Sequence, residues 1–384
     1  MSSPANNGMI GGDLADLLDS GSDRGSARMR EILKDETVAQ ICANRHDRIF
    51  YTDRTGTKQV ERGVFNQETY LSWVNELLTQ TDVGYSDVRS ARTSIIEGSF
   101  DPDKTNLHGS IHVVTRESSG GDPIVTVRKQ PRDIVTLDHM LAQNMMSPAM
   151  RLFLEQAIRG RLNILVSGGS GAGKTTLLKA MSWYIPPDNR IVTAEDIREL
   201  HLDERLPNVA ALNTVRHRDD EGRLIRETSL VDIVTEALRM RPDRILVGET
   251  RGKEAYALTK ACTTGHDGSW TTVHADTSQA AWKQLVGYVI EAGVPDHVAR
   301  DRVANAFHLS IQISRGSMGQ RLISEITEIE SVAEGSELRR NQLFSYDWAN
   351  KQFVVGQHPT SQIINQLQRH GCNFDELLNN INSL

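Results

Sequence analysis

Residues Gly168–Thr176 read GGSGAGKTT, and this stretch decides the fold class of the chain. It matches the phosphate-binding loop pattern G-x4-G-K-[ST], and it stands between the apolar segment NILVS and the helix-forming segment TTLLKAMSWYI. Glycines let the backbone curl so that successive N–H groups face a phosphate, and the following helix adds the partial positive charge of its N-terminus. A Gly-rich turn without a ligand is the alternative, but the strand–loop–helix context favours a nucleotide site.

The loop also predicts roles for its side chains. Lys174 is expected to reach the β- and γ-phosphates, and Thr175 is expected to bind Mg²⁺ through its hydroxyl. We therefore expect ATP and Mg²⁺ as cofactors. The residues expected to contact the nucleotide are Gly168, Gly169, Ser170, Gly171, Ala172, Gly173, Lys174, Thr175 and Thr176.

Two other apolar segments end in acids. Glu249 ends RILVGE, and Glu195 ends RIVTAE, with Asp196 and Glu199 close behind it. In open α/β sheets, ligands bind at the carboxyl edge of the strands. An acid at that edge can hold the water shell of Mg²⁺ or orient water for attack on a phosphoryl group. Capping of a helix N-terminus is the alternative for the second segment.

Histidines and arginines complete the candidate set. His266 lies in the segment CTTGHDG, and His274 directly follows the strand-forming residues WTTV. A histidine at a carboxyl strand edge can sense a γ-phosphate by hydrogen bonding, although a lone buried histidine is usually structural. Arginines such as Arg128 and Arg216 are candidates for stabilising charge on the γ-phosphoryl group, although most surface arginines are only solvated.

A chain of 384 residues is too long for one ordinary core, so we expect two folded units. Residues 1–28 are rich in Gly, Ser, Asn and Asp and are expected to form a flexible tail. Residues 29–136 are expected to form an α+β domain, with a helix at 67–78 and a hairpin formed by SIHVVTR and IVTVR.

The remaining residues, 137–384, are expected to form the larger domain. A helix is predicted from Pro148, with Ser147 as its N-cap, and short apolar strands then recur between helical stretches. This pattern predicts a parallel sheet covered on both faces. With the phosphate-binding loop, it indicates an α/β fold with a RecA-like P-loop domain.

Composition excludes several classes of protein. The net charge of −7 argues against holding nucleic acid by bulk electrostatics. Three widely spaced cysteines give no disulfide framework and no metal cluster, which fits a reducing compartment. The N-terminus lacks the pattern of a secretory signal, and no apolar run approaches the roughly 18 residues of a membrane helix. We therefore expect a cytoplasmic protein that works at a membrane only through partners.

Four segments, taken in order, resemble the signature boxes of the bacterial secretion traffic ATPases. They are GGSGAGKTTLL, TAEDIREL, LRMRPDRILVGETRG and TTGHDGSWTTVHA, and the resemblance around them covers about residues 137–330. That family powers type II and type IV secretion, type IV pili and tight-adherence pili. The segments look most similar to the type IV secretion and tight-adherence branch, with VGET and HADT as mild departures. The N-terminal portion matches the family poorly.

The resemblance implies a ring-shaped homohexamer that hydrolyses ATP and passes motion to inner-membrane platform proteins. Its expected location is peripheral, at the inner face of the cytoplasmic membrane, and no specific nucleic acid is expected as a partner. Glu195 would activate water, and His274, with Gly265 and His266 nearby, would form a histidine box. The implied catalytic residues are Lys174, Glu195, Glu249 and His274; the metal ligands are Thr175 and Glu249; further nucleotide contacts are Arg128 and Arg216.

Three other functions compete with this interpretation. A RecA-like nucleic-acid translocase would have a basic central stripe and would be stimulated by DNA. A P-loop small-molecule kinase would hold a substrate acid and an Arg-rich lid, and would work as a monomer or dimer. A nucleotide-binding scaffold would lack turnover, which the intact Lys174, Glu195 and Glu249 argue against.

Overall fold

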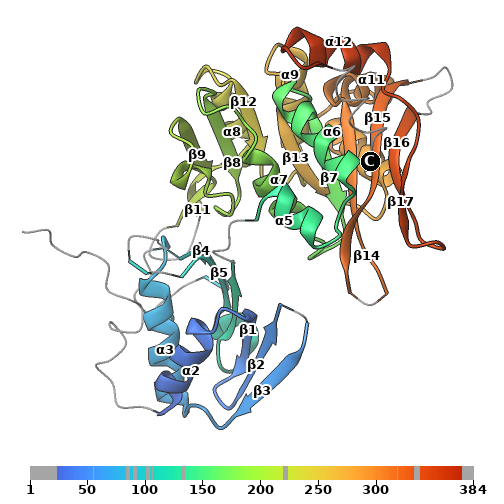
Figure 1. Cartoon of the computed structure of the whole chain (residues 1–384). Helices are drawn as coiled ribbons and strands as arrows, with labels where there is room; N and C mark the ends of the chain where they lie inside the picture. The colour runs from blue at the N-terminus through green and yellow to red at the C-terminus, as the bar shows by residue number, and fades with distance from the viewer. Residues whose placement is uncertain are drawn as a thin grey trace, which may run out of the picture. The chain divides into compact units, whose positions relative to one another are not determined.

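The computed structural model describes residues 24–373, apart from residues 55, 84–86, 90–92, 101–103, 106, 131–134, 219–223, 318 and 333–337. The chain divides into two compact units (Figure 1). The first contains residues up to 133 together with 216–227, and the second contains residues 134–215 and 228 onward. Each unit has a sheet and a hydrophobic core of its own.

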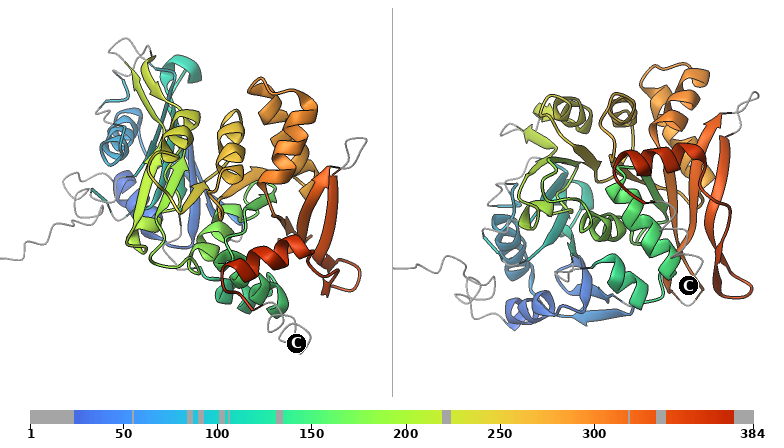
Figure 2. Two further views of the ribbon diagram at one scale, coloured as in Figure 1. Left: turned by 90° about the horizontal axis from the view of Figure 1, so that it is seen from above. Right: turned by 45° about the horizontal axis from the view of Figure 1, so that its top comes forward.

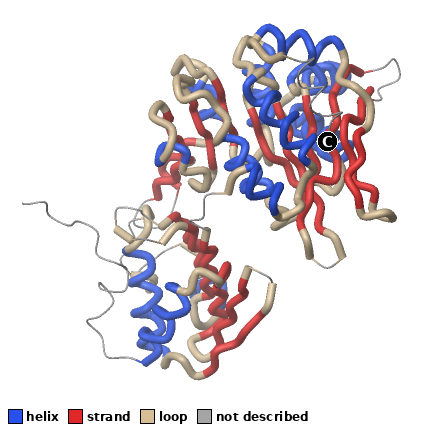
Figure 3. Tube along the Cα trace, viewed as in Figure 1, coloured by secondary structure: helices blue, strands red, loops and turns tan. Residues whose placement is uncertain are grey.

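The first unit is built on an antiparallel sheet of six strands, in the order β3-β2-β1-β6-β5-β4. The strands are β1 (Val38–Arg45), β2 (Arg48–Asp53), β3 (Lys58–Arg62), β4 (Ile95–Ser99), β5 (Gly109–Val114) and β6 (Ile124–Lys129). The helices are α2 (Arg24–Lys34), α3 (Gln67–Thr79) and the short α4 (Arg116–Ser119). Figure 3 shows these helices and strands along the trace.

One face of this sheet is covered by α2 and α3. Met29 of α2 and Trp73 of α3 are buried in one core with Ile41, Ile49 and Val127 of the strands. Strand side chains alternate between the two faces of a sheet, so the strand neighbours of Ile41, Ile49 and Val127 point to the opposite face. We call this the open face, because α2 and α3 do not cover it. The sheet therefore has one apolar face under helices and one face with more polar side chains.

The sequence prediction for this unit is partly confirmed. The predicted helix is α3, capped by Asn66 in a capping box, and the predicted hairpin strands are β5 and β6. Arg116, expected in the first of these strands, instead starts α4. Residues 24–28, expected in the tail, form the start of α2, and the rest of that expected tail lies outside the described residues.

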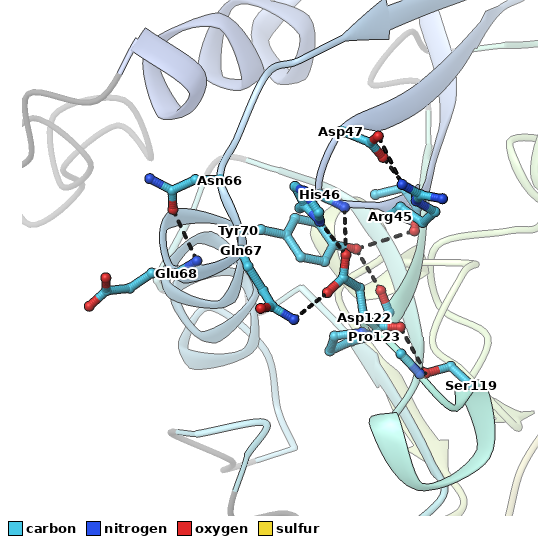
Figure 4. Close-up of polar contacts among 12 residues, drawn as sticks. Arg45, His46, Asp47, Asn66, Gln67, Glu68, Tyr70, Ser119, Asp122 and Pro123 are labelled. Atoms are coloured by element: carbon cyan, nitrogen blue, oxygen red, sulfur yellow. Dashed lines mark hydrogen bonds and ion pairs between the residues drawn. The ribbon is translucent and has the colours of Figure 1, made fainter.

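A buried hydrogen-bond cluster fixes the turn between β1 and β2 (Figure 4). The Asp122 carboxylate accepts from the backbone N–H of His46 at 3.1 Å, lies 2.5 Å from His46 Nδ1, and accepts from Gln67 Nε2 at 3.0 Å. The Tyr70 hydroxyl donates to the Pro123 carbonyl at 2.7 Å, with the Ala43 carbonyl at 3.2 Å. These contacts join three segments far apart in sequence.

The second unit is built on a nine-stranded sheet in the order β17-β16-β15-β14-β7-β13-β12-β8-β9. The run from β14 to β9 is parallel, and β15 to β17 are antiparallel. The strands are β7 (Ile164–Gly168), β8 (Ile191–Glu195), β9 (Val209–Asn213), β12 (Arg244–Val247), β13 (Trp270–His274), β14 (Leu309–Arg315), β15 (Arg321–Val332), β16 (Leu338–Asp347) and β17 (Gln352–Val355). The predicted parallel sheet is thus present, extended by three antiparallel strands that the sequence analysis did not identify as part of it.

Helices cover both faces of this sheet (Figures 1 and 2). One core contains buried residues of α5 (Leu137–Ala142), α6 (Pro148–Arg159), α7 (Lys174–Ser182) and α12 (Ser361–Arg369). The other contains buried residues of α8 (Leu230–Ala237), α9 (Glu254–Thr263), α10 (Ser278–Glu291) and α11 (Asp296–Ala306). The helix predicted from Pro148 is α6, with Ser147 as its N-cap.

Two shorter features complete the description. A 3₁₀ turn covers Leu202–Glu204, and β10 (Val215–Arg218) pairs with β11 (Leu224–Thr228) in a two-stranded sheet. Residues 216–227 of this hairpin group with the first unit, although they lie within the segment expected to form the larger domain. Among the described helices, none combines the length and the apolar character needed to cross a membrane.

Tyr70→Phe tests the buried cluster of the first unit. The substitution keeps the ring but removes the hydroxyl, so the buried carbonyl oxygen of Pro123 loses its donor. We expect the free energy of unfolding of this unit to fall by about 1–3 kcal/mol. Hydrogen–deuterium exchange of peptides from β1 and β6 measures it. Ser72→Ala, an exposed change on the same helix, should stay within about 0.5 kcal/mol of wild type; equal losses in both variants would contradict this account.

Candidate active site

Four neighbouring parallel strands bring the candidate residues to one edge of the second unit's sheet. In the sheet order these strands are β7, β13, β12 and β8. His274 at the end of β13 pairs in register with Gly168 at the end of β7. Val247 at the end of β12 pairs with Ala194, one residue before Glu195. The P-loop, the histidine and both acids therefore lie at the carboxyl edge, where the sequence placed them.

The glycines of the P-loop are needed for its path. Gly171 and Gly173 have φ angles of 66° and 105°, in the left-handed region that favours glycine. At Gly168, a Cβ atom would lie 2.7 Å from the carbonyl oxygen of Ile313 on β14. The loop then enters α7, whose first residue is the buried Lys174, with Thr175 and Thr176 half-buried in the first turn. The backbone therefore has the form of an anion-binding cradle ahead of a helix N-terminus.

The Lys174 ammonium lies within the loop. Its Nζ donates to the carbonyl oxygens of Gly168 and Gly169 at 3.1 and 3.2 Å, and lies 3.0 Å from Nδ1 of His274. An ammonium group can only donate, so Nδ1 of His274 accepts and the ring proton is on Nε2. The lysine and the histidine are thus in direct contact at the mouth of the loop.

This contact continues to the second acid. His274 Nε2 lies 2.9 Å from Glu249 Oε1, although the two atoms do not have hydrogen-bond geometry. The other oxygen of Glu249 accepts from Arg251 at 2.7 Å. Lys174, His274, Glu249 and Arg251 therefore form one continuous polar chain. A ligand that engages Lys174 or Glu249 must rearrange this chain.

Glu195 has a different environment, because it is 3% exposed. Its Oε1 accepts the backbone N–H groups of Glu199 and Leu200, each at 3.0 Å, while its buried Oε2 has no partner in the described part of the chain. Burial disfavours the charged form and raises the pKa of Glu195 from 4.5 to about 7, against the opposing effect of the two N–H groups. A carboxylate with such a pKa can accept a proton near neutral pH.

Gly248 provides the space that Glu195 occupies. A Cβ atom at this position would lie 3.0 Å from Cγ and 3.2 Å from Oε1 of Glu195. Gly248 immediately precedes Glu249, so the two acids are neighbours across β8 and β12. A side chain at position 248 would push Glu195 out of place.

The residues at this edge fit a magnesium–nucleotide complex. The orphaned Oε2 of Glu195 is a buried acceptor without a donor, which a water molecule beside a bound phosphate would satisfy. The Thr175 hydroxyl and the Glu249 carboxylate supply the oxygen ligands that Mg²⁺ prefers. The P-loop supplies the backbone N–H groups.

His266 is not near His274, which corrects the expectation of a compact histidine box. Gly268 and Ser269 donate their backbone N–H groups to Oδ1 of Asn163, the residue that precedes β7. The GHDG segment therefore lies at the amino end of β13, which spans about 13 Å. The expectation failed because a short strand separates the two histidines and places them at opposite edges of the sheet.

The two candidate arginines belong to the first unit. Arg128 lies in β6 with an exposed side chain, and the backbone of Arg216 lies in β10. Their contact with a nucleotide stays a prediction.

Sequence reasoning missed three residues that shape this edge. Arg251 holds Glu249, and Gly248 makes room for Glu195. The buried Glu254 accepts the backbone N–H groups of Arg251 and Gly252, which fixes the loop after Glu249. All three flank Glu249 in the run VGETRGKE, so proximity in sequence was the available signal.

Comparison with known proteins gives a consistent picture. A family model described as Type II/IV secretion system protein matches residues 28–361. The chain is 29% identical over 307 residues to the conjugal transfer protein TrbB of Rhizobium radiobacter, covering 78% of this chain and 85% of the relative. It is 31% identical over 280 residues to the type IV secretion system protein PtlH of Bordetella pertussis, covering 66% and 77%.

Solved structures resemble the fold. The ATPase DotB of Legionella pneumophila matches with a TM-score of 0.55 and 16% identity, over 96% of this chain and 89% of that chain. The pilus retraction motor PilT with bound ADP matches with a TM-score of 0.54 and 16% identity, over 89% and 85%. This likeness confirms the predicted fold class, an α/β P-loop domain with a smaller N-terminal domain.

The raised pKa of Glu195 predicts a pH-dependent effect of Glu195→Gln on stability. An acid with a higher pKa in the folded state binds its proton preferentially there, so it lowers stability as pH rises between the two pKa values, from 4.5 to about 7. The free energy of unfolding of the variant should therefore exceed that of wild type by up to about 3 kcal/mol at pH 8, and the two should be equal at pH 4.5. Urea unfolding followed by tryptophan fluorescence measures this. Asp196→Asn, an exposed neighbouring change, is the control; a gain independent of pH would disprove the interpretation.

Proposed function

This chain belongs to the Type II/IV secretion system protein family, and from that premise we propose that Glu195, Lys174, Glu249 and His274 carry out its ATP hydrolysis. The match to the family model confirms the family inferred from four sequence segments. The chain is therefore an ATPase that drives conformational work in a protein secretion or pilus-assembly machine. The observation that carries the proposal for the site is the buried Glu195 with one oxygen unpaired at the P-loop edge of the sheet.

Nucleotide binding is assigned to the P-loop. The backbone from Gly168 to Gly173 would surround the phosphates of ATP, and Lys174 would leave the carbonyl oxygens of Gly168 and Gly169 to reach the β- and γ-phosphates. Thr175 and Glu249 would hold Mg²⁺, which neutralises phosphate charge when bound. Arg128 and Arg216 are further proposed nucleotide contacts.

Water activation is assigned to Glu195. Two backbone N–H groups hold its Oε1, so Oε2 is the oxygen that can take a proton from the attacking water. Its pKa of about 7 suits a group that must be ionised to accept the proton and protonated afterwards. Fixing one oxygen while leaving the other open positions the carboxylate, and phosphoryl transfer depends chiefly on positioning.

His274 is proposed to report the state of the nucleotide. It contacts Lys174 through one ring nitrogen and lies beside Glu249 with the other. When Lys174 moves to a phosphate, the histidine loses this contact, so its position depends on what the P-loop holds. This would connect the chemistry at the P-loop to motion elsewhere in the chain.

The cellular setting follows from the family. We propose a homohexameric ring at the inner face of the cytoplasmic membrane, attached peripherally through platform proteins of a secretion or pilus machine. The net charge of −7 is unfavourable for a nucleic-acid translocase.

Hydrolysis by three variants tests these assignments. Lys174→Ala should abolish turnover, because the phosphates lose their cation. Glu195→Gln should still bind fluorescent ATP analogues but hydrolyse ATP at least tenfold more slowly, because general base catalysis typically contributes about 10²–10⁴-fold to a rate. Asp196→Asn, next to Glu195 and exposed, should remain within about threefold of wild type. Phosphate release measures all three.

Three results would overturn the assignments. Undiminished hydrolysis by Lys174→Ala would refute the P-loop site, and a wild-type rate for Glu195→Gln would move water activation to another residue. A larger loss in Asp196→Asn than in Glu195→Gln would identify the neighbouring acid as the base.

A further inference from the structure

The first unit has a row of arginines on the open face of its sheet. Strand register pairs Arg45 of β1 with Arg48 of β2, and Arg48 with Arg62 of β3. Ile49 is fully buried under the helices, so the alternating neighbours Arg48 and Phe50 point to the other face. The arginine row therefore faces away from α2 and α3.

The positive charge of this row is only partly balanced. Arg45 donates through Nε and Nη2 to the Asp47 carboxylate, each at 3.0 Å. Arg48 and Arg62 are exposed and form no ion pair within the described part of the chain. Like charges placed directly opposite each other destabilise an antiparallel pair. The pair Arg48–Arg62 is thus unfavourable in the unit itself and would be relieved by an anionic partner.

The row ends at an open strand. β3 is the last strand of the sheet, and in the part of the chain that the structure describes no strand pairs with its outer side (Figure 1). Phe50 pairs with Val60 and Thr52 with Lys58, so Lys58, Val60 and Arg62 share the open face. Val60 is 44% exposed between the two basic residues.

Charged side chains on an edge strand commonly prevent unwanted pairing. Three features go beyond that role. Arg48 lies on the second strand, where it protects no edge, and the acid of β3, Glu61, is bound by Arg28 at 2.7 Å and so does not neutralise the open face. Val60 is apolar and exposed, so it favours pairing at this edge and does not prevent it.

The surface is also held in place. The turn after Arg45 is fixed by the contacts of His46 with Asp122 and by the Tyr70 hydroxyl (Figure 4). Arg45 directly precedes this turn, and Asp47 lies in it. A partner would therefore meet a preformed surface, which lowers the entropy cost of binding.

We propose that β3 docks an extended acidic segment of a partner protein, which adds to the sheet as a further strand. Acids at alternate positions would face Lys58 and Arg62, with Arg48 behind them, and an apolar residue between the acids would cover Val60. Backbone hydrogen bonds would give affinity, and the alternating side chains would give specificity. This goes beyond the ATPase activity and does not depend on it.

A second copy of this chain does not fit the same edge. Antiparallel pairing of β3 with itself about a two-fold axis places Lys58 opposite Arg62 at both ends. That arrangement adds two like-charge pairs to the Arg48–Arg62 pair. The charge pattern therefore selects an acidic partner over self-association.

Fluorescence anisotropy with the full chain tests the docking surface. The labelled peptide SETVTETS has one glutamate two residues before its valine and one two residues after it. The first control, SKTVTKTS, has lysine in place of both glutamates. The second control is the acidic peptide N-methylated at alternate residues. We expect the acidic peptide to bind wild type, and Arg48→Glu together with Arg62→Glu to weaken it at least tenfold. The double variant should prefer the lysine peptide. Lys34→Glu, on α2 at the covered face, should leave binding unchanged.

Thermal unfolding separates lost docking from lost folding. Arg48→Glu alone places an acid opposite Arg62, so its Tm should not fall while peptide binding weakens. Equal binding of the N-methylated peptide would overturn strand addition, because that peptide cannot form the backbone bonds. Binding of anionic vesicles or a single-stranded oligonucleotide through Arg48 and Arg62, with no binding of the acidic peptide, would overturn the proposal in favour of those ligands.

Discussion

Parallel strands deliver the residues that follow them to one edge of a sheet, and the second unit depends on this constraint. β7, β13, β12 and β8 are neighbours, so the P-loop, His274, Glu249 and Glu195 meet although more than 100 positions separate the first and last of them in the sequence. The helices on both faces bury β7, β8 and β12 along their whole length and leave only His274 of β13 exposed.

At that edge, the two acids are made different by their surroundings. Glu249 forms an ion pair with Arg251, which gives it a counter-charge close by, and it also lies beside His274. Glu195 is buried against Gly248, and this burial raises its pKa although two backbone N–H groups on Oε1 oppose the rise; its Oε2 has no hydrogen-bond partner among the described residues. One acid is thereby suited to a cation and the other to a proton. This division of roles arises from burial and neighbours, since both side chains are glutamates.

The sequence predicted the parts of this site that repeat a strong local pattern. The P-loop, the buried strands and the two acids after them follow from residue types and spacing, and the family was recognisable from four short segments. The separation of His266 from His274 was not predicted, because both lie in one short segment and only the strand between them sends them to opposite edges. Gly248 and Arg251 were missed because their importance comes from contacts with Glu195 and Glu249. The first unit was harder still: β1, β2 and β3 carry mixed polar and apolar residues, and their register decides which arginines stand side by side.

The central claim is that Glu195 is the base that activates water, and the pH dependence of kcat/KM tests it most directly, because that ratio reports ionisation in the free enzyme. For wild type, we expect kcat/KM for ATP to rise with pH through an apparent pKa of about 7 and then to level off. Glu195→Gln should have a much lower kcat/KM and lack this rise. A wild-type profile that is flat from pH 5 to 9, or the same rise in Glu195→Gln, would show that Glu195 is not the base that activates water.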